Sequence, residues 1–169
     1  MRHMVRGAIR RGTGLALSLA VLGCSKPLAT FDVTEPAAGR PALQRSEAES
    51  SASRSGRVVA IARAYLGAPY AWGGSSPDGF DCSGFVLYVY SHVGVALPHN
   101  AAKQFRYGAP ITRERLQPGD VVFFDGLHHA GIYVGDGRFI HARRSGHGVI
   151  VSGLDESWYR TRWVGGRRF

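Results

Sequence analysis

Residues 67–85, GAPYAWGGSSPDGFDCSGF, contain the feature that decides the fold of this chain. Glycines and a proline crowd the stretch before Cys82, and a long apolar run, Phe85 to Val95, follows it. This pattern predicts a thiol placed at a sharp turn into a buried element. At a helix N-terminus the thiolate is favoured, so we expect the thiol pKa to lie below its usual value of about 8.5. The chemistry is therefore expected at Cys82, with histidines as its partners.

Length, composition and charge bound the possible partners. The 169 residues suffice for one modest domain plus extensions, and a hydrophobic content of 44% suits a globular core. The net charge is +9, but the first 23 residues hold four arginines and no acid, so 17 basic and 12 acidic residues, or +5, follow them. No nucleic-acid-binding motif accompanies this excess, so nucleic acid is not expected; an anionic wall polymer or a membrane surface fits the charge.

Residues 1–23 read as a secretory signal, since arginines precede an apolar run that is too short for a bilayer span of about 20 residues. The sequence VLGC that ends at Cys24 resembles a bacterial lipobox, which predicts lipidation of that cysteine. The alternative is ordinary cleavage that leaves Cys24 as a spare thiol. Ser25 follows it, and by resemblance to lipoproteins of bacteria with two membranes we expect an anchor in the outer membrane, facing the periplasm.

Residues 24–55 are rich in Ala, Ser, Pro and Glu without a sustained apolar period, which predicts a flexible linker. The folded domain is expected to cover residues 56–169. Its first helix is predicted over residues 57–66, where four apolar side chains share one helical stripe. These are Val58, Ile61, Ala62 and Tyr65.

The order of the remaining elements predicts an α+β fold. The length of the apolar run over 83–95 favours a buried helix, although its Val and Tyr content would also suit a strand. Residues 117–120, QPGD, predict a turn. Short strands separated by Gly- or Asp-containing turns follow, so helices come first and antiparallel strands second. The predicted strands cover 121–124, 130–134, 138–142 and 148–151.

A cysteine nucleophile needs a base, and the base works best when a third group orients it. The chain holds seven histidines, of which one leaves with the signal and three are readily explained as packing or surface residues. Those four are His3, His92, His99 and His147. The candidates that remain are His128, His129 and His141.

Strand geometry chooses among these candidates. If residues 135–137 form a three-residue hairpin loop, His129 and His141 share one face of the sheet as diagonal neighbours, about 7–8 Å apart between backbones. His128 then points to the other face. We expect a helix packed on the shared face to supply Cys82. A two-residue turn would reverse the parity and destroy this pairing.

Two other interpretations stay open at this point. The histidines could be ordinary surface imidazoles. Alternatively, Cys82, His129 and His141 could bind zinc, which accepts such ligands, but the sequence suggests no fourth ligand. We therefore expect neither a metal nor another cofactor.

Several motifs in order resemble the NlpC/P60 cell-wall peptidases: PYAWGGSSPDGFDCSGFV, LPHNAAKQ, LQPGDVVFF, HAGIYVGDGRFIHA and the closing basic segment. The resemblance covers residues 57–169. It implies a papain-like fold whose nucleophile helix packs on an antiparallel sheet. It also implies a bacterial cysteine endopeptidase that cuts peptidoglycan stem peptides, typically between γ-linked D-glutamate and the following diamino acid.

By position, the resemblance makes Cys82 the nucleophile, His129 the base and His141 the orienting residue. Further positions match the oxyanion and substrate site of the family, namely Tyr70 for its hydroxyl, and Asp81 and Ser83 for shaping the site. Tyr70 could instead be a core aromatic, and Asp81 a helix cap. Two positions depart from the family pattern, since His99 stands where relatives often carry arginine and Ala130 where they often carry valine.

Three functions fit these observations. The leading one is an envelope-anchored peptidoglycan endopeptidase. The same thiol chemistry would serve an amidase or acyl-transfer enzyme, and a wall-binding lipoprotein with a silent site is the third. A regulatory protein partner is expected for a wall hydrolase, but no motif identifies it.

Overall fold

Two apolar surfaces of one antiparallel sheet organise the fold. The computed structural model describes residues 42–144 and 147–169, so the predicted signal segment, Cys24 and the first part of the predicted linker lie outside the described residues. The described residues belong to one compact unit, Arg40 to Phe169. The helices are α1 (Ala42–Ala64), α2 (Cys82–Ser91), α3 (Ala101–Gln104) and α4 (Ser157–Thr161), and 3-10 turns cover Arg113–Arg115 and Asp125–Leu127.

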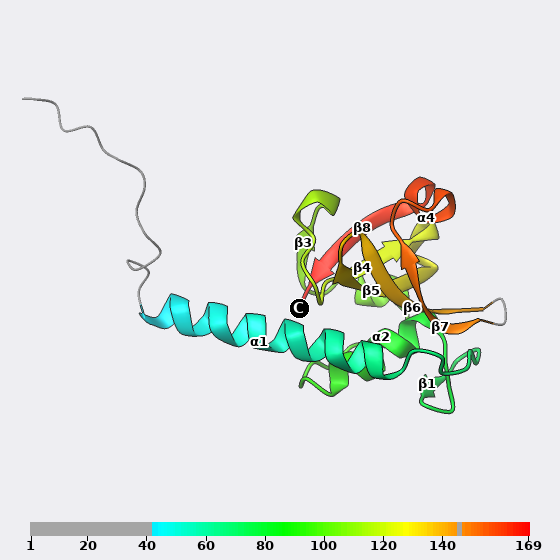
Figure 1. The fold of residues 1–169 in the computed structure, drawn as a ribbon, viewed down its shortest axis with the longest axis horizontal. Helices are drawn as coiled ribbons and strands as arrows, with labels where there is room; N and C mark the ends of the chain where they lie inside the picture. Colours follow the sequence, from blue (N-terminus) through cyan, green and yellow to red (C-terminus); the bar gives the residue numbers. More distant parts are fainter. Residues whose placement is uncertain (1–41, 145–146) are drawn as a thin grey trace, which may run out of the picture. The chain divides into compact units, whose positions relative to one another are not determined.

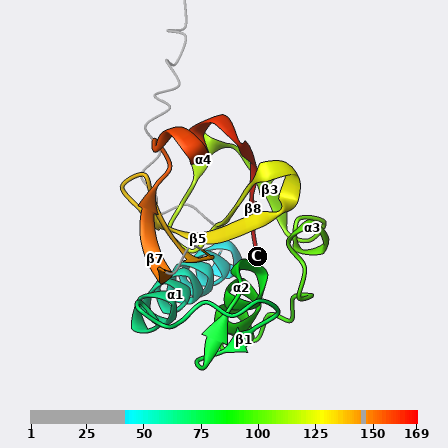
Figure 2. The ribbon, with the colours of Figure 1, turned by 90° about the vertical axis from the view of Figure 1, so that its right-hand side faces the viewer.

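The main sheet has six strands in the order β3-β8-β4-β5-β6-β7, and every neighbouring pair is antiparallel. Figures 1 and 2 show α1 and α2 side by side next to this sheet. A separate small hairpin, β1 with β2, precedes α2. The strands are β1 (Ser75–Ser76), β2 (Gly79–Phe80), β3 (Ala109–Ile111), β4 (Val121–Phe124), β5 (His129–Gly135), β6 (Arg138–Arg143), β7 (Gly148–Gly153) and β8 (Trp163–Arg168).

The first core cluster lies between the sheet and the helices α1 and α2. Val58 and Ala62 of α1 and Phe85 of α2 pack there against alternate residues of the central strands, such as Phe123 and Ile132. These side chains are at most 1% exposed. The helix α2 is therefore buried, as its apolar sequence predicts, and the α+β fold class is confirmed.

The second core cluster uses the other face of the same strands. Val122 and Phe124 of β4, Phe139 of β6 and Tyr159 of α4 are buried in it. Successive residues of β4 thus enter opposite clusters, which explains why all four residues of that strand are buried. Figure 2 shows α4 across the sheet from α1 and α2.

The helix α1 begins at Ala42, inside the segment that was predicted to be a flexible linker. Residues 49–54 expose their side chains, so no apolar stripe marks this part of the helix. Alanine, glutamine, glutamate and arginine are good helix formers, and they extend the helix that Val58 and Ala62 anchor in the core. Among the described helices, none has the length and apolar character needed to cross a bilayer.

The hairpin of β5 and β6 has a shorter turn than expected, combined with a bulge. Gly135 pairs with Arg138, which leaves a two-residue turn, and the register shifts between Tyr133 and Gly135. The extra residue, Val134, restores the parity that the short turn alone would reverse. Beyond the bulge, Ile132 pairs with Ile140, and this register continues toward His129 and His141.

Candidate active site

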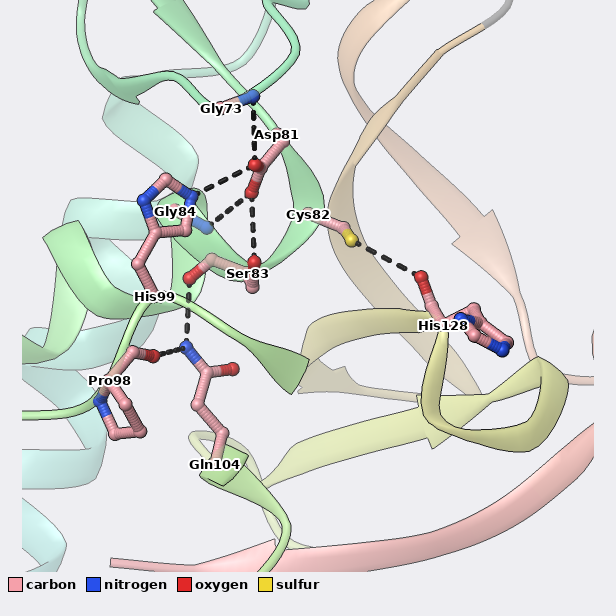
Figure 3. Close-up of polar contacts among 9 residues, drawn as sticks. All are labelled: Gly73, Asp81, Cys82, Ser83, Gly84, Pro98, His99, Gln104 and His128. Atoms are coloured by element: carbon pink, nitrogen blue, oxygen red, sulfur yellow. Dashed lines mark hydrogen bonds and ion pairs between the residues drawn. The ribbon is translucent and has the colours of Figure 1, made fainter. Parts of the chain in front are cut away.

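Cys82 is the first residue of α2, and Asp81 caps this helix. Asp81 has an extended backbone, and its Oδ1 accepts a hydrogen bond from the Gly84 amide at 2.7 Å. A carboxylate at this position satisfies a backbone N–H that has no partner within the helix, and it complements the helix dipole. The motif DCSG thus directs Cys82 to the N-terminal end of a buried helix (Figure 3).

The Asp81 carboxylate binds four donors in all. Its Oδ1 also accepts from the Ser83 hydroxyl at 3.0 Å, while Oδ2 accepts from the Gly73 amide at 3.1 Å and from His99 Nε2 at 2.9 Å. This carboxylate therefore joins the glycine-rich loop, the start of α2 and the segment that follows α2. A direct contact of Asp81 or Ser83 with substrate stays a prediction, since both side chains are engaged within the protein.

Gly84 lets the helix approach the glycine-rich loop. A Cβ on Gly84 would lie 2.0 Å from the Gly74 carbonyl oxygen and 2.8 Å from His99 Nε2. Backbone is in contact with backbone here, so only glycine fits without movement of the loop. Gln104 supports the same region, because its amide nitrogen donates to the carbonyl oxygens of Ser83 and Pro98.

His129 and His141 meet on one face of the sheet, as predicted. His129 Nε2 lies 2.8 Å from His141 Nδ1. His141 is fully buried, and its Nε2 lies 3.2 Å from both the Ser152 hydroxyl and the Tyr159 hydroxyl. A chain of polar groups therefore runs inward from His129, and sequence reasoning missed its last two members because a serine on β7 and a tyrosine on α4 carry no motif.

The expected position of the nucleophile helix is wrong in one respect. His129 and His141 face the second cluster, where their rings contact Phe124, Phe139 and Tyr159. The helix α2 packs in the first cluster, on the opposite face. Cys82 reaches the histidine side because it is the first residue of α2 and lies at the end of the sheet where β5 starts. Its Sγ donates to the His128 carbonyl oxygen at 3.7 Å (Figure 3).

Burial favours the neutral forms of Cys82 and His129. It raises the pKa of the Cys82 thiol, although hydrogen bonds from the backbone of Ala130 and Ser83 oppose this effect. Burial likewise lowers the pKa of His129 to about 4, helped by the charge of Arg143 and opposed by that of Asp125. The lowered thiol pKa that the helix N-terminus predicts is therefore not found. The resting pair is a thiol and a neutral imidazole.

A cavity of about 630 Å³ opens onto these groups. Cys82, His129 and Tyr70 line it together with Asp81 and Ser83, so the structure brings all the candidate side chains except His141 to one surface. Burial raises the pKa of Tyr70, as do the nearby Cys82 and Asp81, while Arg144 lowers it. The Tyr70 hydroxyl therefore stays protonated and can donate a hydrogen bond in the cavity.

The same cavity holds residues that sequence reasoning did not place there. Trp72 is 81% exposed and lines the cavity, whereas Phe80 of the same glycine-rich stretch is fully buried. Trp158 and His99 line it as well. The glycine-rich stretch around Trp72 is the one sequence signal that could have suggested an exposed tryptophan near Cys82, since Trp158 lies far away in sequence.

The closing basic segment is not a free basic surface. Arg168 binds the buried Asp120 carboxylate through two hydrogen bonds of 2.8 and 2.7 Å. Arg167 donates to the Phe105 carbonyl oxygen at 2.6 Å and stacks over its ring, 3.7 Å from the centroid. These two arginines therefore hold β8 against its neighbours. Among residues 42–144 and 147–169, no cluster of three or more His, Cys, Asp or Glu has the arrangement of a metal site.

Comparison with known proteins identifies the family. The sequence profile of the NlpC/P60 family matches residues 67–168. The chain is 41% identical to a probable endopeptidase of Mycobacterium bovis over 126 residues, which are 74% of this chain and 33% of the relative. It is 45% identical to a gamma-DL-glutamyl hydrolase of Bacillus subtilis over 119 residues, covering 66% of this chain and 29% of that one. The chain thus spans about a third of the length of these curated relatives.

Solved structures resemble the fold described here. A crystal structure of an NlpC/P60 family protein from Bacillus cereus has a TM-score of 0.66 at 35% identity, over 68% of this chain and 40% of that one. The NlpC/p60 domain of the peptidoglycan hydrolase SagA has a TM-score of 0.62 at 33% identity, over 68% of this chain and 98% of that domain. The order of the motifs, the cysteine at the start of a buried helix and the profile match together place this chain in the NlpC/P60 family.

Proposed function

We propose that this protein is a cysteine endopeptidase that hydrolyses the stem peptides of peptidoglycan. The observation that carries the proposal is the cavity in which the thiol of Cys82 and the ring of His129 are both accessible, with His141 hydrogen-bonded behind the ring. The names of the relatives support the substrate, since they include a gamma-DL-glutamyl hydrolase and a murein DD-endopeptidase.

A base role for His129 requires one particular set of tautomers. In this set His129 Nε2–H donates to His141 Nδ1, and His141 Nε2–H donates to the hydroxyl of Ser152 or Tyr159, which agrees with the contacts of 2.8 and 3.2 Å. His129 Nδ1 is then a lone-pair acceptor. Because the pKa of His129 is about 4, its ring is unprotonated at neutral pH and can accept a proton.

The proposed reaction begins when His129 takes the proton of Cys82 as the sulfur attacks the amide carbonyl. The Tyr70 hydroxyl and the Cys82 amide are the candidate donors to the oxyanion, and one such donor can contribute about 2.7–4 kcal/mol. His129 then protonates the leaving amine. Water hydrolyses the thioester with the same imidazole as base, while His141 maintains its tautomer.

For the bond that is cut, we propose the γ-D-glutamyl–diamino acid amide. Two relatives support it by name, the gamma-DL-glutamyl hydrolase and a gamma-D-glutamyl-L-lysine dipeptidyl-peptidase of Bacillus cereus. A cut in the D,D cross-link is the second candidate, because a murein DD-endopeptidase of Escherichia coli is 43% identical over 112 residues.

Mass analysis of digested peptidoglycan tests both the reaction and the bond. Fragments that end in D-glutamate, released by the wild type and by the surface control His92→Gln but not by Cys82→Ala or His129→Gln, would support the proposal. Fragments separated only at the cross-link would support the D,D cut. Fragments freed from muramic acid would indicate an amidase, and no release by any folded variant would favour a wall-binding protein.

We also propose that lipid on Cys24 anchors the protein in the envelope, at the outer membrane and facing the periplasm. The apolar leader and the VLGC sequence support this proposal. Cell fractionation of the full chain tests it. The wild type should sediment with outer membranes, whereas Cys24→Ala should lose the lipid mass and leave the membrane fraction.

A further inference from the structure

The charged side chains that line the cavity of Cys82 differ in whether they have a partner within the protein. Two of its lining carboxylates have partners, since Asp81 binds four donors and Asp125 lies 3.7 Å from Arg162. Arg144 also lines the cavity, yet within the described part of the chain it forms no ion pair. A guanidinium at the nucleophile without a carboxylate partner is available to an anionic group of a ligand.

Arg144 lies close to the reacting groups. It directly follows β6, the strand that carries His141. Arg144 lines the same cavity as Cys82 and Tyr70, so the guanidinium and the thiol face one space. A ligand that reaches Cys82 therefore passes within range of the Arg144 charge.

Trp72 holds this guanidinium without using its hydrogen bonds. The Arg144 guanidinium carbon lies 5.3 Å from the centroid of the Trp72 ring, a cation–π contact. Such a contact orients the planar group and leaves its N–H donors free. The exposure of Trp72, which has no role in the core, is explained if the ring positions Arg144 at the cavity that both residues line.

We propose, building on the proposed function, that Arg144 binds the free α-carboxylate of the γ-linked D-glutamyl residue on the acyl side of the cut. The γ-linkage consumes the side-chain carboxyl group, so the α-carboxylate stays ionised. Two methylene groups and the Cα separate it from the scissile carbonyl carbon. Arg144 and the Cys82 sulfur would then contact the two ends of the same residue, with a bidentate pair at the carboxylate.

Amidation of the substrate tests this pairing. A peptide with D-isoglutamine has a neutral carboxamide in place of the α-carboxylate and is otherwise the same. Hydrogen bonds to a charged partner correspond to about a 10- to 100-fold preference, so the wild type should cleave the D-glutamyl peptide that much more efficiently, measured as kcat/KM. Arg144→Gln should reduce this ratio to within about threefold of one, and Arg144→Lys should give an intermediate ratio.

The experiment uses the tripeptides L-Ala-γ-D-Glu-L-Lys and L-Ala-γ-D-isoGln-L-Lys. Arg138→Gln is the matched control, because it removes one exposed charge from the other end of β6 and should keep the wild-type ratio. An equal kcat/KM of the wild type for both peptides, or the same ratio in Arg144→Gln, would overturn the role of Arg144 alone. Cleavage of neither peptide by the wild type would overturn the proposed function and this inference with it.

Discussion

Acidification should destabilise this protein through the two hydrogen-bonded histidines of the candidate site. Burial lowers the pKa of His129 from 6.5 to about 4, and burial, together with the charges of His129 and Arg143, lowers the pKa of His141 well below 6.5. In the unfolded chain both rings protonate near 6.5. The unfolded state therefore binds more protons between these pH values, and the free energy of unfolding falls as the pH falls through this window.

The size of the effect follows from the His129 shift. The contribution of His129 to the free energy of unfolding is fully present above pH 6.5 and is completely lost below about pH 4. Between pH 7.5 and 4.5, a shift from 6.5 to about 4 corresponds to a loss of about 2.5 kcal/mol. His141 contributes in the same direction. This is a large share of the roughly 5–15 kcal/mol that stabilises a typical domain.

Urea unfolding followed by tryptophan fluorescence at pH 7.5 and 4.5 measures the loss. The wild type should lose about 2.5 kcal/mol more between these pH values than His129→Gln, which has no titratable group at that position. His92→Gln is the control, because it removes an exposed histidine and should follow the wild type. Equal losses in the wild type and His129→Gln would refute the argument that burial of a neutral imidazole causes the acid sensitivity.

Two further pairs of substitutions test the packing and the closing strand, each by urea unfolding. Gly84→Ala places a Cβ against the backbone of the glycine-rich loop, so it should cost about 1–3 kcal/mol of stability and abolish hydrolysis. Gly56→Ala adds a Cβ in open space on α1, so it should be neutral or stabilise the protein by up to about 1 kcal/mol. Equal effects of the two substitutions would contradict the close approach at Gly84. Arg168→Ala removes the guanidinium that pairs with the Asp120 carboxylate, which is 2% exposed and keeps only the hydrogen bond from the Gln117 amide among the side-chain contacts described, and should cost about 3 kcal/mol. Arg162→Ala breaks an exposed pair and should cost less than about 1 kcal/mol, so similar losses from the two arginines would contradict the role assigned to the closing strand.

Elements with a clear hydrophobic period could be predicted from the sequence. The strand over 121–124 has the predicted bounds, and the other three predicted strands differ by no more than two residues at either end. The helix after Cys82 was predicted from its length and apolar content, and it ends at Ser91. In these segments the residues that form the element are also those that it buries, so the local pattern and the packing agree.

Elements held by partners distant in sequence could not be predicted. The strand β8, WVGGRR, has two glycines and two arginines, which weaken any strand signal. It forms because it pairs with both β3 and β4, and because Arg168 reaches Asp120. In the same way, His99 was considered a surface residue, since its partner Asp81 is a neighbour only in the folded chain.

The pairing of His129 with His141 was predicted correctly, although the loop behind that prediction differs. Asp136 and Gly137 both have positive φ, as a type I′ turn requires, and such turns close two-residue hairpins. This turn alone would place the two rings on opposite faces.

The bulge at Val134 adds the residue that returns the rings of His129 and His141 to one face, so the turn and the bulge together give the parity of a three-residue loop. Whether two side chains on paired strands share a face depends only on how many residues separate the paired positions along the chain. A sequence argument can therefore find the right face with the wrong turn, whereas the turn type itself depends on backbone conformations that only the folded hairpin reveals.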